Sequence, residues 1–175
     1  YSIQTNNSGG NINPSTGAYV AGNTGSVTDT VRVTDGTNTA TATVTVTAAI
    51  AIAPLAPTAP PGGSVAFGAT GGNGSYTFAI STNNSGGSVN ATSGAYVAGN
   101  TGAVTDTVTV TDGLGKTANT TVSVGPVVAI SPATASVAPL GTRAFSASGG
   151  DGSYSFSFAP GGNNSSGSIT SGGAY

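Results

Sequence analysis

Cysteine, histidine, methionine, tryptophan and glutamate are all absent from this sequence of 175 residues. Without cysteine there is no disulfide framework and no thiol nucleophile. Without histidine or glutamate, the most common general bases are missing, and the abundant serines and threonines have no imidazole to activate them. The sequence therefore predicts a protein that is not an enzyme.

Charge is also scarce, with three Lys or Arg residues and five Asp residues. Ordinary domains carry roughly 25% charged residues, so Thr, Ser, Asn and Gly must form most of this surface. Three cations give no electrostatic footprint for binding a phosphate backbone, which argues against a nucleic-acid partner. No apolar run approaches the roughly 20 residues that span a bilayer, so we expect no membrane insertion in this segment.

What the sequence does contain is a repeat. The run YVAGNTG at Tyr19 returns at Tyr96, 77 positions later, and VTDTVRVTDG at Val27 returns as VTDTVTVTDG at Val104. Repeats of this length, read as one long domain, would give the wrong fold. We therefore expect separate small units of about 77 residues.

The register of the repeat divides the chain into three parts. Phe67 returns as Phe145, 78 positions later, and the one-residue slip lies in a turn. We predict a complete unit over residues 49–125. Residues 1–48 match the C-terminal part of a unit, and residues 126–175 match the N-terminal part.

Apolar and polar residues alternate with period two between clusters of Gly and Asn, which is typical of an all-β domain with short strands. The clearest strand carries Val104, Asp106, Val108 and Val110 and ends at an Asp-Gly turn. We predict an all-β fold of tandem sandwich repeats, each with about seven strands.

Two strands open each unit. Pro54 suits a first edge strand that bends or switches sheets, because proline cannot donate to a central ladder. The second strand is predicted to run unbroken through Val65, Phe67 and Ala69.

Aromatic residues recur at equivalent places and form the predicted core. These structural residues are Phe67 and Phe78 in the complete unit and Phe145 and Phe156 in the last one.

A family resemblance rests on these motifs. The order I-x-P, G-x-x-x-F-x-A-x-G-G-x-G-x-Y, then SGG, SGAY and VTDTVTVTDGLGKTA resembles bacterial immunoglobulin-like repeats of large extracellular surface and adhesin proteins. The pattern runs through residues 130–154, 85–96 and 104–124. It differs from antibody-type domains in lacking the paired cysteines and the core tryptophan. The resemblance implies spacers, stalks or adhesin arms.

Asp29 and Asp106 are the most informative charged residues. They share strand parity with the neighbouring valines, so their carboxylates should point inward, where burial without partners is costly. We expect each to accept hydrogen bonds from backbone N–H groups of the preceding loop. The alternative is a Ca²⁺ site shared with Asp35 or Asp112, with oxygens from loops or from another unit. No other cofactor is expected.

Tyr19 and Tyr96 follow a glycine and an alanine in each copy. We expect half-buried rings whose hydroxyls bond to backbone, as in tyrosine corners. A platform that stacks on sugars is the alternative.

These features predict a structural repeat of an extracellular bacterial filament, stalk or adhesin. It would act as a rigid spacer that associates with other copies of the same protein. A module that binds glycans or cells is the alternative, but the nearly identical loops favour structure. We expect a secreted, cell-surface location and read the chain as an excerpt from a longer array. Alternatively, the two partial units complement each other between molecules, at the expense of a duplicated segment of about 20 residues.

Overall fold

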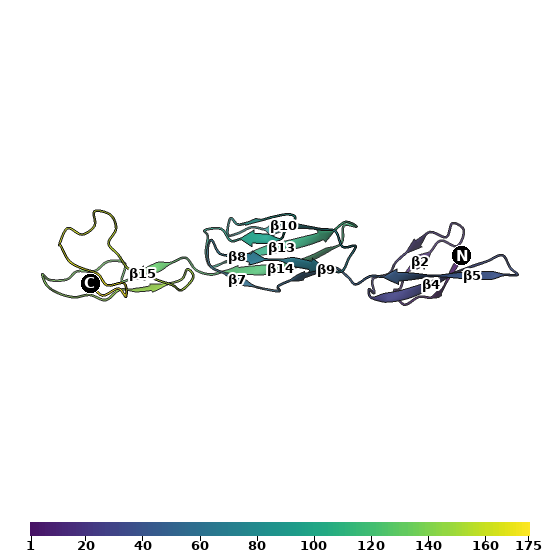
Figure 1. Ribbon diagram of the computed structural model, residues 1–175, viewed down its shortest axis with the longest axis horizontal. Helices are drawn as coiled ribbons and strands as arrows, with labels where there is room; N and C mark the ends of the chain where they lie inside the picture. The colour runs from purple at the N-terminus through teal and green to yellow at the C-terminus, as the bar shows by residue number, and fades with distance from the viewer.

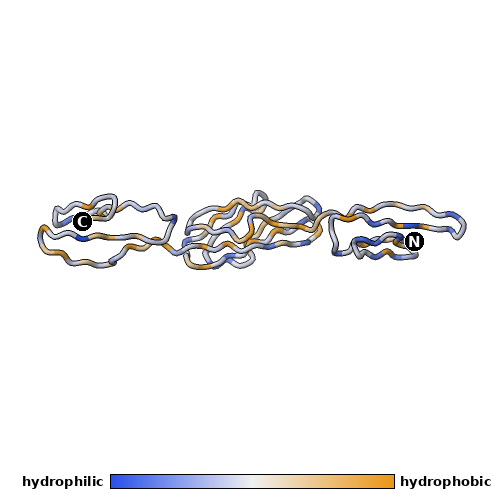
Figure 2. Tube along the Cα trace, turned by 90° about the horizontal axis from the view of Figure 1, so that it is seen from below, coloured by the Kyte–Doolittle hydropathy of each residue, from blue (hydrophilic) through white to orange (hydrophobic).

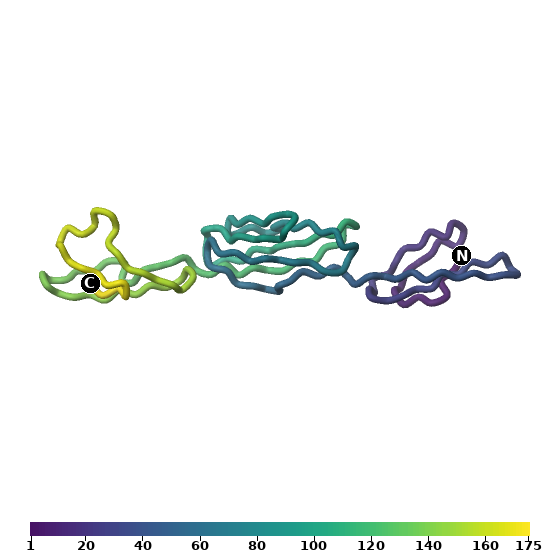
Figure 3. The backbone as a smooth tube through the Cα atoms, in the orientation of Figure 1, coloured from purple at the N-terminus to yellow at the C-terminus, as the bar shows by residue number.

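The computed structural model describes residues 1–175, and all of its regular elements are β-strands. The strands form three bodies that follow one another along the long axis of the molecule (Figure 1). The strands up to Val46 lie in the N-terminal body, those from Ala51 to Val124 in the middle body and those from Ala129 onward in the C-terminal body. A single stretch of chain joins each body to the next (Figure 3). The all-β prediction is confirmed. No helix is present that has the length and apolarity of a membrane span.

The N-terminal body contains a three-stranded antiparallel sheet with the order β1-β4-β5 and a two-stranded ladder of β2 and β3. Its strands are β1 (Ser2–Thr5), β2 (Asn11–Ile12), β3 (Tyr19–Val20), β4 (Val27–Thr34) and β5 (Thr39–Val46). The hairpin of β4 and β5 is in register along its whole length, and Asp35-Gly36 begins the turn that connects the two strands.

The middle body is a sandwich. One layer is the sheet β10-β13-β14-β7, and the other is formed by the sheet β11-β12-β8 and the pair β6-β9. Its strands are β6 (Ala51–Ala53), β7 (Thr58–Ala59), β8 (Ser64–Ala66), β9 (Gly68–Thr70), β10 (Tyr76–Thr82), β11 (Ser88–Val89), β12 (Ala95–Val97), β13 (Val104–Asp112) and β14 (Thr117–Val124).

One strand prediction was wrong. The segment through Val65, Phe67 and Ala69 is two strands, because β8 pairs with β12 and β9 pairs with β6. At the break, the N–H of Phe67 donates to the carbonyl of Gly94 at 3.0 Å, while the ring is buried in the core. The opening strand is also divided, as its proline predicted: β6 pairs with β9, whereas β7 pairs in parallel with β14. These two switches make nine short strands from the seven that were expected.

The hydrophobic core lies in the middle body. Its buried members are Ile52, Ala59, Phe67, Phe78, Tyr96, Ala98, Val108, Val110, Val122 and Val124. The rings of Phe67 and Tyr96 meet edge to face with centroids 6.2 Å apart, a favourable aromatic geometry. Hydrophobic segments also occur in both outer bodies (Figure 2). There, however, Phe145 and Phe156 are only half-buried.

The C-terminal body has little regular structure. It contains the ladder of β15 (Ala129–Ser131) and β16 (Ser146–Ser148) and an isolated bridge between Ala144 and Ala174. Residues 154–158, equivalent to the start of β10, have no strand partner. The reason is that the strand equivalent to β13, with which β10 pairs in the middle body, is not among residues 126–175.

Candidate functional site

A buried carboxylate cluster joins the two layers of the middle body. The alternation of β13 turns Asp106 inward with Val108 and Val110, and its exposed fraction is 0%. The backbone N–H groups of Asn84 and Ser85 donate to Oδ1, each at 2.8 Å. The hydroxyl of Ser85 donates to Oδ2 at 2.5 Å, and that of Tyr96 donates to the same oxygen at 2.7 Å. With four donors, the carboxylate is fully satisfied although it is away from water.

The N-terminal body repeats this cluster. The backbone N–H of Ser8 donates to Oδ1 of Asp29 at 2.8 Å, and its hydroxyl donates to Oδ2 at 2.5 Å. The hydroxyl of Tyr19 donates to Oδ2 at 2.6 Å. Asp29 and Ser8 are buried although this body has only the β2–β3 ladder as its second layer and no equivalent of β6 to β9. This ladder and the loop of Ser8 are therefore enough to exclude water from the cluster.

The C-terminal body holds two of the three groups. The hydroxyls of Ser165 and Tyr175 lie 2.7 Å apart. These residues are equivalent to Ser85 and Tyr96, but residues 126–175 contain no counterpart of Asp106.

The hydrogen bonds favour the ionised form of both aspartates. Donation from Ser8 and then from Tyr19 lowers the pKa of Asp29 to about 2. Burial opposes ionisation of Asp106, but the bonds from Ser85 and Tyr96 outweigh it and its pKa also lies below the ordinary value. Burial, together with the bond to Asp106, raises the pKa of Tyr96 to about 12. The cluster is thus a stable combination of carboxylate and neutral phenol near neutral pH.

The tyrosine expectation needs correction. The hydroxyls of Tyr19 and Tyr96 bond to carboxylates rather than to backbone, and the ring of Tyr96 is completely buried. A buried ring cannot stack on a sugar. The sequence reasoning also missed Ser8 and Ser85, although the repeated N-N-S-G-G run that precedes each Tyr was a signal for them.

Asp112 is the buried last residue of β13, and Asp35 directly follows β4, so each lies at the far end of the strand that carries Asp106 or Asp29. Asp112 accepts backbone N–H bonds from Asn73, Leu114 and Lys116 at 3.2, 2.9 and 2.8 Å.

Asp35 is exposed and accepts from the backbone of Thr37 at 2.8 Å and Asn38 at 2.6 Å. The structure does not bring the four aspartates together, and it contains no group of three or more side chains suited to a metal ion.

The joints between bodies are a second repeated feature. At the first joint, the N–H of Gly72 donates to the carbonyl of Ala48 at 2.8 Å, and the hydroxyl of Thr47 donates to the carbonyl of Gly72 at 2.9 Å. At the second joint, the N–H of Gly150 donates to the carbonyl of Pro126 at 2.9 Å. Each linker is therefore bonded to the glycine turn of the body that follows.

Glycine is needed at these joints. Gly71 and Gly149 have φ values of +74° and +75°. A Cβ on either would lie 2.1 Å from the carbonyl oxygen of Ala49 or Val127 in the linker. Only a residue without a side chain allows the turn to approach the linker this closely.

No protein family and no curated protein matches this sequence. Solved structures give partial likenesses. The C-terminal 282-residue fragment of intimin, determined in complex with the intimin-binding domain of the translocated intimin receptor, is 24% identical with a TM-score of 0.46. That match covers 64% of this chain and 44% of the fragment.

An intimin mutant of EHEC O157:H7 is 22% identical with a TM-score of 0.37, over 46% of this chain and 48% of the other. Domains 4 and 5 of the S-layer protein SbsC are 21% identical with a TM-score of 0.34, over 62% of each chain. These are immunoglobulin-like domains of bacterial surface proteins, the class that the repeat motifs resemble. At these identities the likeness is one of fold alone.

Proposed function

We propose that this chain is a non-catalytic, rigid spacer within an extended bacterial cell-surface protein. The observation that carries the proposal is the repeated joint. The bond from Gly72 to Ala48 and the bond from Gly150 to Pro126 recur at an offset of 78 residues, so both linkers are attached in the same way. A repeated joint gives a repeated orientation, and the bodies then extend in a line.

The loop of the preceding body also contacts each linker. A Cβ on Gly25 would lie 2.5 Å from the carbonyl oxygen of Thr47, and one on Gly102 would lie 2.5 Å from that of Gly125. The N–H of Ala103 donates to Gly125 at 3.0 Å. The linker is thus packed from both sides. This supports stiffness, because motion between bodies requires the loss of these bonds.

Low charge and repeated loops fit this role. Charged residues make up only 5% of the chain, so clusters of like charge that would steer a charged ligand by their electrostatic field are absent. The two complete carboxylate clusters are buried and use their polar atoms internally, so they stabilise the fold instead of presenting a binding surface.

The test is the distribution of distances across the first joint. Because the chain lacks cysteine, Thr41→Cys and Thr121→Cys can be labelled uniquely at exposed positions of the first two bodies. Single-molecule energy transfer or pulsed electron resonance should give one narrow distance distribution. Gly71→Ala, which places a methyl against the linker, should broaden it.

Gly68→Ala is the matched control, because a Cβ there meets nothing within 4 Å. It should leave the distribution unchanged. A broad distribution in the parent chain would show independent bodies and would contradict the rigid spacer.

A further inference from the structure

Asn73 and Gly74 form the single Asn-Gly pair of the chain, and they lie in the glycine turn that is bonded to the first linker. Both residues are exposed. Gly74 has a φ of +85°, and a Cβ on it would meet nothing within 4 Å. Its backbone N–H donates no hydrogen bond to another part of the chain. The nitrogen of Gly74 is therefore unhindered, and it follows a residue type that is chemically labile.

The side-chain amide of Asn73 is polarised by the fold. The backbone N–H groups of Ser75 and Gly113 donate to Oδ1 at 3.1 and 3.0 Å. Two donors on a carbonyl oxygen stabilise the negative charge that develops there when a nucleophile adds to the carbon, as in an oxyanion hole. Gly113 lies 40 positions away in the turn of the β13–β14 hairpin, so this donor is present only in the folded middle body.

Two other asparagines have the same pair of donors but a different following residue. Oδ1 of Asn90 accepts two backbone N–H groups at 3.0 and 2.9 Å and precedes Ala91, whose side chain shields its nitrogen. Oδ1 of Asn13 accepts two at 3.0 Å and precedes Pro14, which has no N–H to lose. Among these three, only Asn73 combines a polarised amide with an unhindered N–H.

We propose that Asn73 is a site of self-modification, at which the folded chain converts the asparagine to aspartate and isoaspartate. The nitrogen of Gly74 loses its proton to a hydroxide ion and bonds to Cγ of Asn73. The side-chain nitrogen takes a proton from water and leaves as ammonia. Water then opens the resulting succinimide at either carbonyl. In sum, one water is consumed and one ammonia is released, and nothing is oxidised or reduced.

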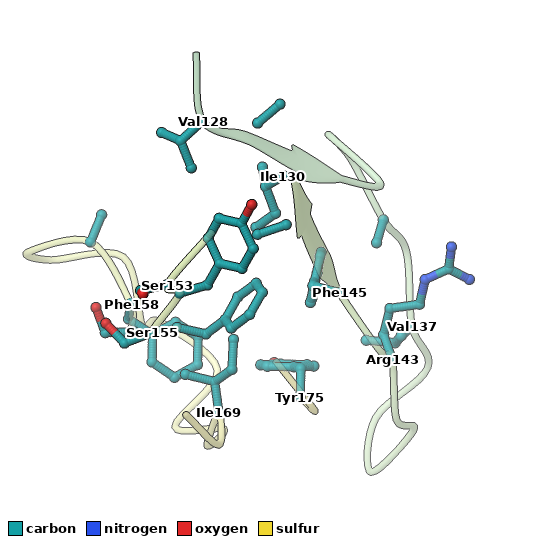
Figure 4. A pocket seen from close by; sticks show the side chains of 17 residues that line it. Val128, Ile130, Val137, Arg143, Phe145, Ser153, Ser155, Phe158, Ile169 and Tyr175 are labelled. Atoms are coloured by element: carbon teal, nitrogen blue, oxygen red, sulfur yellow. The ribbon is translucent and has the colours of Figure 1, made fainter. Parts of the chain in front are cut away.

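The next repeat shows that aspartate fits this turn. Asp151 occupies the equivalent position, and its Oδ1 accepts the N–H of Ser153 at 2.9 Å. Ser153 is among the residues around an apolar cavity of the C-terminal body (Figure 4). The bond from Gly150 to the second linker is intact beside Asp151. Aspartate at position 73 is therefore compatible with the shape of the turn, whereas isoaspartate adds a methylene group to the backbone and is not.

The new charge faces Asp112. The N–H of Asn73 donates to Oδ2 of Asp112 at 3.2 Å, and a Cβ on Gly72 would lie 2.5 Å from the same oxygen. A second carboxylate in this turn repels the first. Gly72 is also the residue that donates to Ala48 of the linker, so a displaced turn weakens the first joint. The conversion does not depend on the proposed spacer role, but this effect on the joint rests on it.

Ageing of the 175-residue chain in water enriched in oxygen-18, at mildly alkaline pH, tests the conversion. Peptide mass spectrometry should show the loss of the Asn73 amide, with heavy oxygen in the new carboxyl group, while Asn90 and Asn13 stay intact. Gly74→Ala should slow the loss, because a methyl group hinders the nitrogen.

A free peptide of residues 69–77 separates the fold from the local sequence. The folded chain should convert at least as fast as the peptide, because the peptide has no donor from Gly113. Slower conversion in the folded chain would mean that the fold protects Asn73, and it overturns the proposal. Equal loss at Asn90, or an unchanged rate in Gly74→Ala, also overturns it.

The distance distribution between labels at Thr41→Cys and Thr121→Cys reads the joint. The aged chain and Asn73→Asp should both give a broader distribution than the fresh parent. Asn100→Asp, which adds a charge at an exposed position of the same body, is the control and should not. An unchanged distribution after complete conversion overturns the effect on the joint. A broad distribution in the fresh parent would instead contradict the rigid spacer, because the conversion is measured by mass alone.

Discussion

The hydroxyl of Tyr96 donates a 2.7 Å hydrogen bond to Oδ2 of Asp106 across the interior of the middle body. Tyr96 belongs to β12 in one layer and Asp106 to β13 in the other. In a chain without cysteine, this bond is a polar connection between the two layers. The same pair, Tyr19 and Asp29 at 2.6 Å, forms in the N-terminal body, which has no equivalent of β6 to β9. The pair therefore does not require those strands.

Asp106→Ala should destabilise the middle body by at least about 3 kcal/mol. The substitution leaves two hydroxyls and two N–H groups without their acceptor, and each unsatisfied buried group costs about 1–3 kcal/mol. Amide hydrogen exchange of β13 and β14 reports this body separately from its neighbours. Asp151→Ala, in an exposed turn, is the control. Equal exchange in the two variants would contradict a stabilising role for the cluster.

Tyr96→Phe removes the hydroxyl but keeps the ring, so it measures the contribution of the hydroxyl to stability alone. The ring keeps its contact with Phe67, so the expected loss is only about 1–2 kcal/mol for one hydrogen bond to a charged group. The pKa of Tyr96 in the folded protein is about 12, above the ordinary value of 10.0. The neutral phenol thus adds stability that is complete below pH 10 and lost as the pH rises toward 12.

The phenylalanine variant should lack this alkaline loss in the middle body. Tyr1→Phe, at an exposed ring, should retain it. Urea unfolding at a series of pH values between 8 and 12 measures the difference, and an unchanged alkaline profile in Tyr96→Phe would argue against the bond.

Acid should weaken the N-terminal body within a defined window. The pKa of Asp29 is about 2 in the folded protein and 3.8 in the reference state. A lowered carboxylate pKa adds stability that is complete above the reference value and lost as the pH falls through the folded value. Hydrogen exchange of β4 should therefore be constant from pH 7 to about 4, after correction for the intrinsic rate, and accelerate between about 4 and 2. Asp29→Asn should remove most of this dependence. An onset near pH 6 would point to a different group.

Local pattern was enough to predict the strands and the inward carboxylates. The alternation around Asp106 fixes its direction, and Asp-Gly fixes the hairpin turn, because both are properties of neighbouring residues. The break at Phe67 was not predictable in this way. It depends on which strand lies on each side, and that choice is made by packing. The repeated N-N-S-G-G run marks Ser85, but its partner was not predictable from neighbouring residues, since the carboxylate lies 21 positions away.

Gly99→Ala tests how closely the loop of the cluster must pack. The N–H of Gly99 donates to the hydroxyl of Ser85 at 3.0 Å. A Cβ at this position would lie 1.9 Å from the carbonyl oxygen of Ser85, which is a severe steric clash. The backbone of the loop must shift, which also moves the hydroxyl and N–H groups that hold Asp106. We expect a loss of about 2–3 kcal/mol, typical of strain in a packed interior. Gly68→Ala should change stability by about 0.5 kcal/mol or less, since it meets no atom and its φ is not positive. Urea unfolding of both variants is the test. Similar unfolding midpoints for Gly99→Ala and Gly68→Ala would show that the loop adapts to a side chain and that the cluster does not require this contact.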